Sequence, residues 1–213
     1  MRKRADLVRR VQVGCGPKNI RAEWLNTDLR DFPGIDQVLD VTQPWPWRDQ
    51  LDAVYGEHFL EHLTIEQASA FLRYAGEALR KGGLLRLSTP ALEFVIETHY
   101  PLPPTEGEAD HAATLRTNRA FYGWGHHFLY SRNFLSWTLV SHGYEEIEFC
   151  EYGESRHEIL QGMEMHGGYR RTPMGFPTVW IVEARRGEQP IEPMDVWTER
   201  IDTEFSKHVR SGH

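Results

Sequence analysis

A glycine-rich turn directly after a short apolar strand is the feature that most constrains this chain. The segment Val11–Val13 runs straight into Gly14-Cys15-Gly16, which predicts a buried strand ending in a tight turn. Glycine lets the backbone of such a turn approach a ligand closely. A second apolar run ends at Asp28, fourteen residues beyond Gly14, where a carboxylate could accept both hydroxyls of a ribose. Together these features predict a nucleoside-binding edge.

Downstream, strands and a helix follow in the order of a parallel α/β sheet. Leu51–Tyr55 and Leu84–Leu87 are predicted strands, and a helix is predicted between them. Thr64 and Gln67 have the spacing of a capping box that opens this helix, and Gly82-Gly83 is predicted to end it after two basic residues. Strand, helix and strand then form a right-handed crossover.

The later part of the chain continues this pattern. Ser131 is predicted to cap a helix that reaches about Ser141, and strands are predicted over Glu145–Glu151 and Thr178–Ala184. The first connection is unusual, because only seven residues separate Gly16 from Trp24. A helical crossover normally needs a dozen or more. The ligand site is therefore expected to be more open here, or to be closed by another segment such as the N-terminal arm.

Length and composition predict one soluble domain over residues 1–213. A chain of 213 residues with 40% hydrophobic and 26% charged residues can bury one substantial core. Residues 1–10 are expected to form a basic N-terminal arm and residues 190–213 a polar tail. No apolar run approaches the roughly 20 residues that span a bilayer. No hydrophobic signal core follows the basic start, so we expect a cytoplasmic protein without membrane partners.

Charge and cysteine content exclude other classes. A net charge of −7 argues against binding nucleic acid, because that affinity comes chiefly from lysine and arginine. The two cysteines, Cys15 and Cys150, form neither a CxxC pair nor a disulfide framework, and both are expected to be free thiols.

The motifs resemble those of class I S-adenosylmethionine-dependent methyltransferases. That family has a GCG turn, a strand-end acid, a second acid (here Asp40) and a Gly-Gly before a strand, in this order. The chain is most similar to a small bacterial subgroup with a G-C-G…W-x-N-x-D start and an E-H-x-x-E-H-L segment, closely over residues 11–90 and loosely over 125–185. The resemblance implies a single Rossmann-like α/β domain. Its mostly parallel seven-stranded sheet would have the order 3-2-1-4-5-7-6, with an antiparallel last strand.

The resemblance also assigns residues to S-adenosylmethionine. Asp28 would hold the ribose diol and Asp40 the adenine amino group; a turn or cap role is the structural alternative for both. The remaining cofactor residues would be Gly14, Cys15 and Gly16 in the turn, Leu29 and Val41 flanking the adenine, and Glu57 and His58 at the methionine end. Gln12 stands where the wider family often has an acid, so that contact to the cofactor's amino end is not predicted.

The segment from His58 to His62 also matches H-x-x-E-H, the zinc signature of inverted metalloproteases. Such ligands require both histidines on one helical face. Here His58 directly follows a predicted strand, and the predicted helix begins only after His62. The same text occurs in the resembling methyltransferases. We therefore predict no bound metal.

Residues 99–130 combine prolines, glycines, aromatics and histidines without clean periodicity. This composition is typical of an active-site insertion or lid. His126 and His127 lie in it, and an imidazole beside the ligand edge could orient or deprotonate an acceptor. A hydrogen-bonding spacer is the structural alternative.

These patterns favour methyl transfer to an oxygen or nitrogen of a small-molecule acceptor, with natural-product or glycan biosynthesis as candidate settings. A non-catalytic S-adenosylmethionine-binding partner subunit would look identical around Gly14–Asp40. A nicotinamide-dependent oxidoreductase is disfavoured, because Asn19 occupies the third glycine position of G-x-G-x-x-G. The sequence predicts neither the acceptor's identity nor the oligomeric state.

Overall fold

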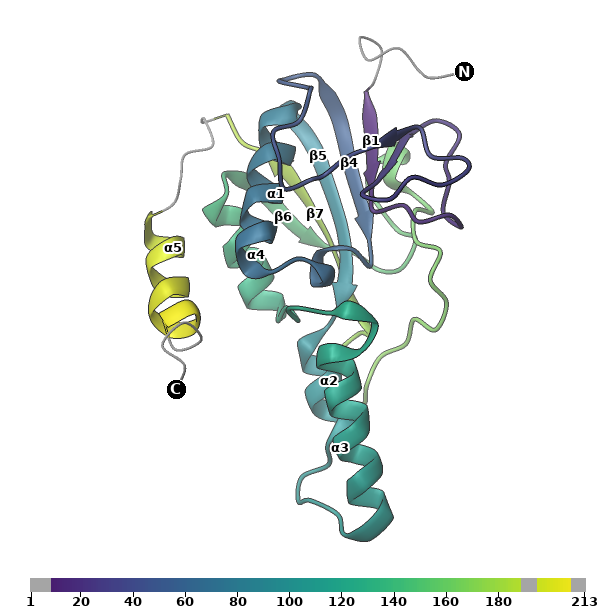
Figure 1. The fold of residues 1–213 in the computed structure, drawn as a ribbon, viewed down its shortest axis with the longest axis vertical. Coiled ribbons are helices and arrows are strands. Elements are labelled where there is room, and N and C mark those ends of the chain that lie inside the picture. The colour runs from purple at the N-terminus through teal and green to yellow at the C-terminus, as the bar shows by residue number, and fades with distance from the viewer. Residues whose placement is uncertain (1–8, 189–194, 208–213) are drawn as a thin grey trace.

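A seven-stranded sheet forms the centre of the computed structural model, which describes residues 9–188 and 195–207 (Figure 1). The strand order is β3-β2-β1-β4-β5-β7-β6, as predicted. The first five strands pair in parallel, and β7 is antiparallel to β5 and to β6. The strands are β1 (Arg10–Val13), β2 (Leu25–Asp28), β3 (Gln37–Val38), β4 (Leu51–Glu57), β5 (Leu79–Pro90), β6 (Tyr144–Phe149) and β7 (Val179–Arg186).

Helices cover one face of this sheet, and two others project from its lower end. Figure 1 shows α1 and α4 in front of the strands, with α2 and α3 extending below them as a hairpin. The helices are α1 (Ile65–Ala78), α2 (Leu92–His99), α3 (Gly107–Tyr122), α4 (Arg132–Ser141) and α5 (Asp195–Ile201), with short turns η2 (Leu60–His62), η3 (Gly123–Gly125), η4 (Glu158–Leu160) and η5 (Asp202–Ser206). Within the described ranges, none of them is both long and apolar enough to cross a membrane.

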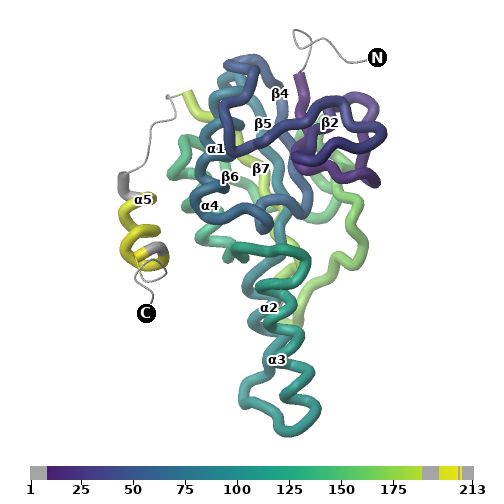
Figure 2. The backbone as a smooth tube through the Cα atoms, in the orientation of Figure 1, coloured from purple at the N-terminus to yellow at the C-terminus, as the bar shows by residue number. Residues whose placement is uncertain are grey.

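The opposite face of the sheet is covered by residues 150–178 where a first crossover helix would normally lie. Residues 14–24, all of them described, form turns and no helix. Trp24 and Tyr55 pack instead against Leu160 and Met163, and the Tyr55 hydroxyl donates to the carbonyl of Met163 at 2.7 Å. Figure 2 shows this light-green segment running alongside the first strands. Residues 1–8 of the predicted N-terminal arm lie outside the described part of the chain.

A buried ion cluster fixes this covering segment. Arg86 of β5 is fully buried and donates two 2.8 Å hydrogen bonds to the carboxylate of Glu164, and it also pairs with Glu183. Burial alone would lower the pKa of Arg86, but the two carboxylates outweigh it and raise that pKa. The adjoining residues, Met165 and His166, are thereby held beside the end of β4.

The predicted end of the first long helix is wrong. The capping box of Thr64 and Gln67 is present in full, but α1 stops at Ala78 rather than at Gly82-Gly83. Leu79 already pairs with Leu51 in the sheet, and the register shifts just beyond that pair. A Cβ on Gly83 would lie 2.8 and 2.9 Å from two backbone oxygens, so glycine serves an irregular strand here and not a helix stop.

Of the predictions for the chain after residue 99, one helix is confirmed and another helix was not predicted. The helix capped by Ser131 is confirmed as α4, and the Ser131 hydroxyl accepts from the Phe134 amide. The absence of periodicity over residues 99–130 predicts no helix, yet half of these residues lie in the 16-residue α3. Only Ala113 and Ala120 of α3 are buried, so the helix has almost no apolar stripe to reveal its period. The predicted polar tail contains α5, which packs through Trp197 against Ile65 of α1; residues 190–194 and 208–213 lie outside the described ranges.

Candidate functional site

Two cavities meet at the carboxyl edge of the parallel strands. The large cavity, of about 700 Å³, lies between the glycine turn, the end of β4 and the α2–α3 hairpin. The aspartate cavity, of about 590 Å³, lies over the ends of β2 and β3. Both are lined by Gly14, His58, His62 and Trp124, so they adjoin. Open α/β sheets bind ligands at this edge.

The glycine turn fits the predicted close approach to a ligand. Gly14 and Gly16 have φ angles of 56° and 60°, which favour glycine. A Cβ on Gly14 would lie 2.5 Å from the Phe59 ring, whereas one on Gly16 would meet nothing within 4 Å. Gly16 therefore leaves its side of the large cavity open. Burial and then the nearby Asp28 raise the pKa of the Cys15 thiol to about 11, so this cysteine is neutral near pH 7.

Asp28 ends β2 as a buried, strongly hydrogen-bonded carboxylate. It accepts from the Gly16 amide at 3.1 Å and from the backbone and guanidinium of Arg30 at 3.0 and 3.1 Å. Burial would raise the pKa of Asp28, but these hydrogen bonds outweigh it and hold the pKa below its ordinary value. The Arg30 side chain is 70% exposed, so it can leave without disturbing the core. Asp28 is thus a fixed acceptor at the cavity wall.

The other predicted adenosine residues also line the aspartate cavity. Asp40 is exposed, and one of its oxygens accepts from the Thr42 amide and hydroxyl at 3.0 and 2.6 Å. The turn role considered from the sequence is therefore present at that oxygen. Leu29 is 67% exposed at the rim, whereas Val41 is buried. The structure brings these three residues together with Asp28.

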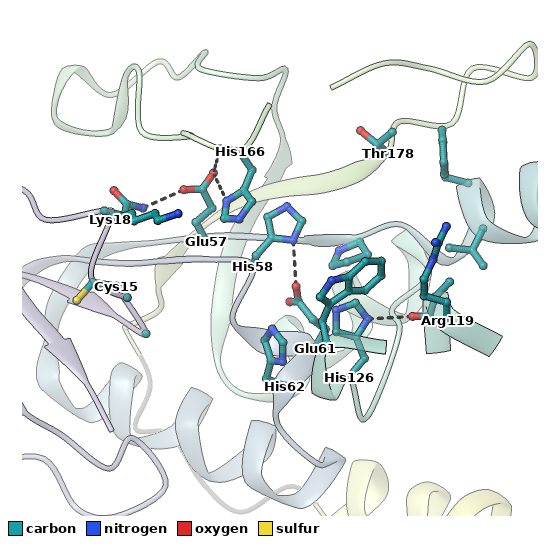
Figure 3. A pocket seen from close by; sticks show the side chains of 18 of the residues that line it. Cys15, Lys18, Glu57, His58, Glu61, His62, Arg119, His126, His166 and Thr178 are labelled. Atoms are coloured by element: carbon teal, nitrogen blue, oxygen red, sulfur yellow. Dashed lines mark hydrogen bonds and ion pairs between the residues drawn. The ribbon is translucent and has the colours of Figure 1, made fainter. Parts of the chain in front are cut away.

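Glu57 ends β4 under the large cavity. One carboxylate oxygen accepts from the Asn19 side chain at 3.0 Å, and the other accepts from the Met165 and His166 amides at 2.7 and 2.9 Å. Figure 3 shows Glu57 facing the His166 ring. The covering segment and the first connection therefore both meet at this carboxylate.

His58 follows in a backbone conformation that non-glycine residues rarely adopt, with a φ of 45°. Its Nδ1 lies 3.1 Å from a carboxylate oxygen of the fully buried Glu61. The other Glu61 oxygen accepts from the Thr89 hydroxyl at 3.0 Å. Because a carboxylate only accepts, Nδ1 carries the hydrogen and the Nε2 lone pair of His58 is left free. Strain and hydrogen bonding together orient this imidazole (Figure 3).

His126 and His127 of the insertion line different cavities. His126 lines the large cavity, and its Nδ1 lies 2.9 Å from the carbonyl of Ala120. His127 is exposed and lines the aspartate cavity, while its amide donates to the Glu61 carbonyl at 2.7 Å. Each therefore has a structural hydrogen bond as well as an open side.

Several cavity residues escaped the sequence analysis. Asn19 lines the large cavity although the sequence marks it only as a missing third glycine, and His166 lines the same cavity although no sequence motif predicts it. Glu61 and His62 line it as well, although the sequence predicts them only as part of the E-H-x-x-E-H-L segment and of the protease signature. That signature does not form one helical face, since β4 ends at Glu57, His62 ends the short turn η2 and α1 begins at Ile65. Gln12 is buried and is not among the residues that line either cavity.

Comparison with known proteins establishes the fold. No protein-family model and no curated protein matches this sequence. The chain is similar to a solved S-adenosylmethionine-dependent methyltransferase from Archaeoglobus fulgidus, with 16% identity and a TM-score of 0.52 over 84% of this chain and 87% of that one. It is also similar to a possible histamine N-methyltransferase from Thermotoga maritima, with 13% identity and a TM-score of 0.52 over 84% of this chain and 82% of that one.

A third similar structure is the CurJ carbon methyltransferase, with 13% identity, a TM-score of 0.51 and 85% of this chain covered. The present chain spans only 49% of that structure. At such identities the likeness concerns the fold. The fold is the class I methyltransferase type, a Rossmann-like sheet in the order 3-2-1-4-5-7-6 with an antiparallel seventh strand, as predicted.

Proposed function

We propose that this protein transfers a methyl group from S-adenosylmethionine to an oxygen or nitrogen of a small-molecule acceptor. The observation that carries the proposal is the pair of adjoining cavities. One holds a strand-end carboxylate suited to a ribose, the other an oriented imidazole, and Gly14 and His58 line both. A nucleoside in the first cavity would direct its other end past the glycine turn toward His58.

The residues present fit this cofactor. Asp28 would accept the ribose hydroxyls once the exposed Arg30 side chain moves aside, and Leu29 and Val41 would flank the adenine. Asp40 keeps one oxygen for Thr42 and would offer the other to the adenine amino group. Gly14, Cys15 and Gly16 would lie along the cofactor, with Glu57 and its partner Asn19 at the methionine end. The bound sulfonium supplies an already activated methyl group.

His58 is the best supported of the three histidine candidates for general base. Its Nδ1 is held by Glu61, which leaves Nε2 to take a proton from an acceptor hydroxyl or amine. His126 is the second candidate, because it lines the same cavity. His127 lines the aspartate cavity, where a nucleoside is expected, and is the third. The chain's main task is to align the acceptor with the methyl carbon.

The large cavity suits a small acceptor with apolar and polar parts. Its volume of about 700 Å³ lies within the range of small-molecule sites. Phe94, Val95 and Trp124 of the insertion supply apolar walls, and Arg119 supplies a cation. We therefore propose that the insertion between β5 and α4 encloses the acceptor.

Binding and turnover together test the proposal. Calorimetry on the wild-type protein should show saturable binding of S-adenosylmethionine and S-adenosylhomocysteine and none of NAD. Formation of S-adenosylhomocysteine with a panel of hydroxyl and amine acceptors then separates an enzyme from a non-catalytic binding subunit. Binding of NAD in place of S-adenosylmethionine would overturn the proposal, and cofactor binding without turnover on any acceptor would favour the partner-subunit alternative.

A further inference from the structure

Three potential metal ligands meet on one wall of the large cavity. Glu61 and His62 come from the short turn after β4, and His126 comes from the loop after α3, more than sixty residues later. One ligand atom from each lies within 4.8 Å of the other two. Figure 3 shows the three side chains close together below His58. The fold, rather than the H-x-x-E-H spacing, assembles this set.

Both histidines are held in the tautomer that a metal requires. The Nδ1 atom of His62 lies 3.2 Å from the Gly125 carbonyl, and that of His126 lies 2.9 Å from the Ala120 carbonyl. A carbonyl can only accept, so each Nδ1 carries the hydrogen and each Nε2 keeps its lone pair. Metal-bound histidines typically donate their other ring N–H in this way.

The carboxylate of Glu61 is held as firmly as the two imidazoles. Glu61 is fully buried, and its two oxygens contact the Thr89 hydroxyl at 3.0 Å and His58 Nδ1 at 3.1 Å. Ligating carboxylates are usually supported by such hydrogen bonds.

We propose that Glu61, His62 and His126 bind a divalent transition-metal ion, with zinc as the ion that their chemistry fits best. Two imidazoles and one carboxylate form the donor set of catalytic zinc sites, which keep a further position open. Zinc ligands lie about 2.0–2.2 Å from the metal, so their atoms must approach within about 3.5 Å of one another. His62 is exposed and can make this small adjustment. The inference reverses the expectation, drawn from the sequence, that this segment binds no metal.

The site would serve the proposed methyl transfer, and this step alone rests on that function. An open metal position on the cavity wall would bind an acceptor oxygen or nitrogen and lower its pKa. His58, which contacts the ligand carboxylate, would lie beside the same acceptor atom. Metal binding itself does not depend on the acceptor or on the cofactor.

The test measures metal binding without S-adenosylmethionine. The untagged full-length chain is freed of metal with a chelator and titrated with Zn²⁺ by calorimetry and with Co²⁺ by visible absorption. We expect one ion per chain. His62→Ala and His126→Ala should weaken binding by more than the 10- to 100-fold typical of a supporting residue, and His58→Ala by about that smaller factor. His111→Ala, on the exposed side of α3, is the matched control and should bind as wild type does.

Circular dichroism establishes that each variant is folded. If Glu61→Gln does not fold because Glu61 is buried, the exposed His62 still decides the question. Failure of the wild-type chain to bind either ion, or wild-type affinity in both the His62→Ala and the His126→Ala variant, would overturn the site. Zinc binding without methyl transfer would support the metal site and refute the proposed function. Full turnover by metal-free protein that binds no zinc would support the proposed function and refute the metal site.

Discussion

The sheet edge and the α2–α3 insertion build the same cavity by different means. At the edge, Asp28 and Glu57 stand at strand ends, and their places follow from parallel pairing of β1, β2 and β4. In the insertion, Trp124 and His126 follow a helix that is mostly exposed and buries only two alanines. The edge is thus fixed by a continuous buried core, and the insertion by a small separate cluster around Val95, Ala120 and Leu129.

This difference separates the residues expected to bind the cofactor from those expected to select the acceptor. The residues that face the expected cofactor come from the rigid sheet, where geometry is set by the strand register. The residues that enclose the expected acceptor come largely from the insertion, where substitutions cost little stability. A fold can therefore keep its cofactor site and change its acceptor by changing the insertion.

The largest expected effect tests whether the general base comes from the sheet edge or from the insertion. His58→Ala should lower acceptor-saturated turnover by about 10²–10⁴-fold, because it removes the imidazole that Glu61 orients, and should lower cofactor affinity far less, through the lost contact at the methionine end. The measurement is S-adenosylhomocysteine formation, with cofactor binding determined separately. His127→Ala, in the other cavity, is the comparison variant. A similar loss in His126→Ala with unchanged zinc affinity, and none in His58→Ala, would move the base to the insertion.

The second effect concerns the cofactor. Asp28→Ala should weaken S-adenosylmethionine binding by roughly ten- to a hundredfold, because a charge-assisted hydrogen bond is typically worth about 1.5–3 kcal/mol. Calorimetry on the folded variant measures this. Asp31→Ala changes an exposed acid three residues later and should leave the affinity unchanged. Equal affinities in the two variants would remove Asp28 from the ribose site.

The sequence predicted the sheet edge better than the insertion. The strand order and the place of Glu57 were predicted from the resemblance to class I methyltransferases, and the strand end at Asp28 from the apolar run that stops there. The meeting of His62 with His126 could not be predicted, since it depends on how a nearly uniform polar helix docks. His166 was equally hidden, because the buried pair of Arg86 and Glu164, remote in sequence, fixes its segment.

The third effect is one of local stability. Amide hydrogens of the part of α3 before Ala113 should exchange at least about tenfold faster than those of β4 and β5, because that part of the helix buries no side chain. Hydrogen exchange followed by mass spectrometry measures both regions in one sample. A bound acceptor analogue should slow exchange near Trp124 more than in β4. Equal protection of α3 and β4 would show that the insertion is part of the main cooperative unit.

The smallest effect is a pH dependence that contrasts two histidines. His142, at the end of α4, is buried, with its Nδ1 2.7 Å from the Thr138 carbonyl and its Nε2 2.8 Å from the Ser69 hydroxyl. Burial lowers its pKa below the ordinary 6.5, which the hydrogen bond to Thr138 only partly offsets. His99, at the end of α2, also has a lowered pKa, through burial and then the nearby arginines Arg116, Arg119 and Arg170.

The sign of the effect follows from proton uptake. As the pH falls through 6.5, the unfolded chain protonates His142 before the folded chain does, so the free energy of unfolding falls until the folded pKa is passed. His142→Gln should therefore flatten the decline in stability between about pH 7 and pH 5, as measured by urea unfolding at each pH. His99→Gln should leave that global decline nearly unchanged, because the insertion can open without unfolding the sheet. If His99→Gln flattens the decline as much as His142→Gln does, the insertion and the sheet unfold together, and the contrast between them holds for sequence pattern but not for stability.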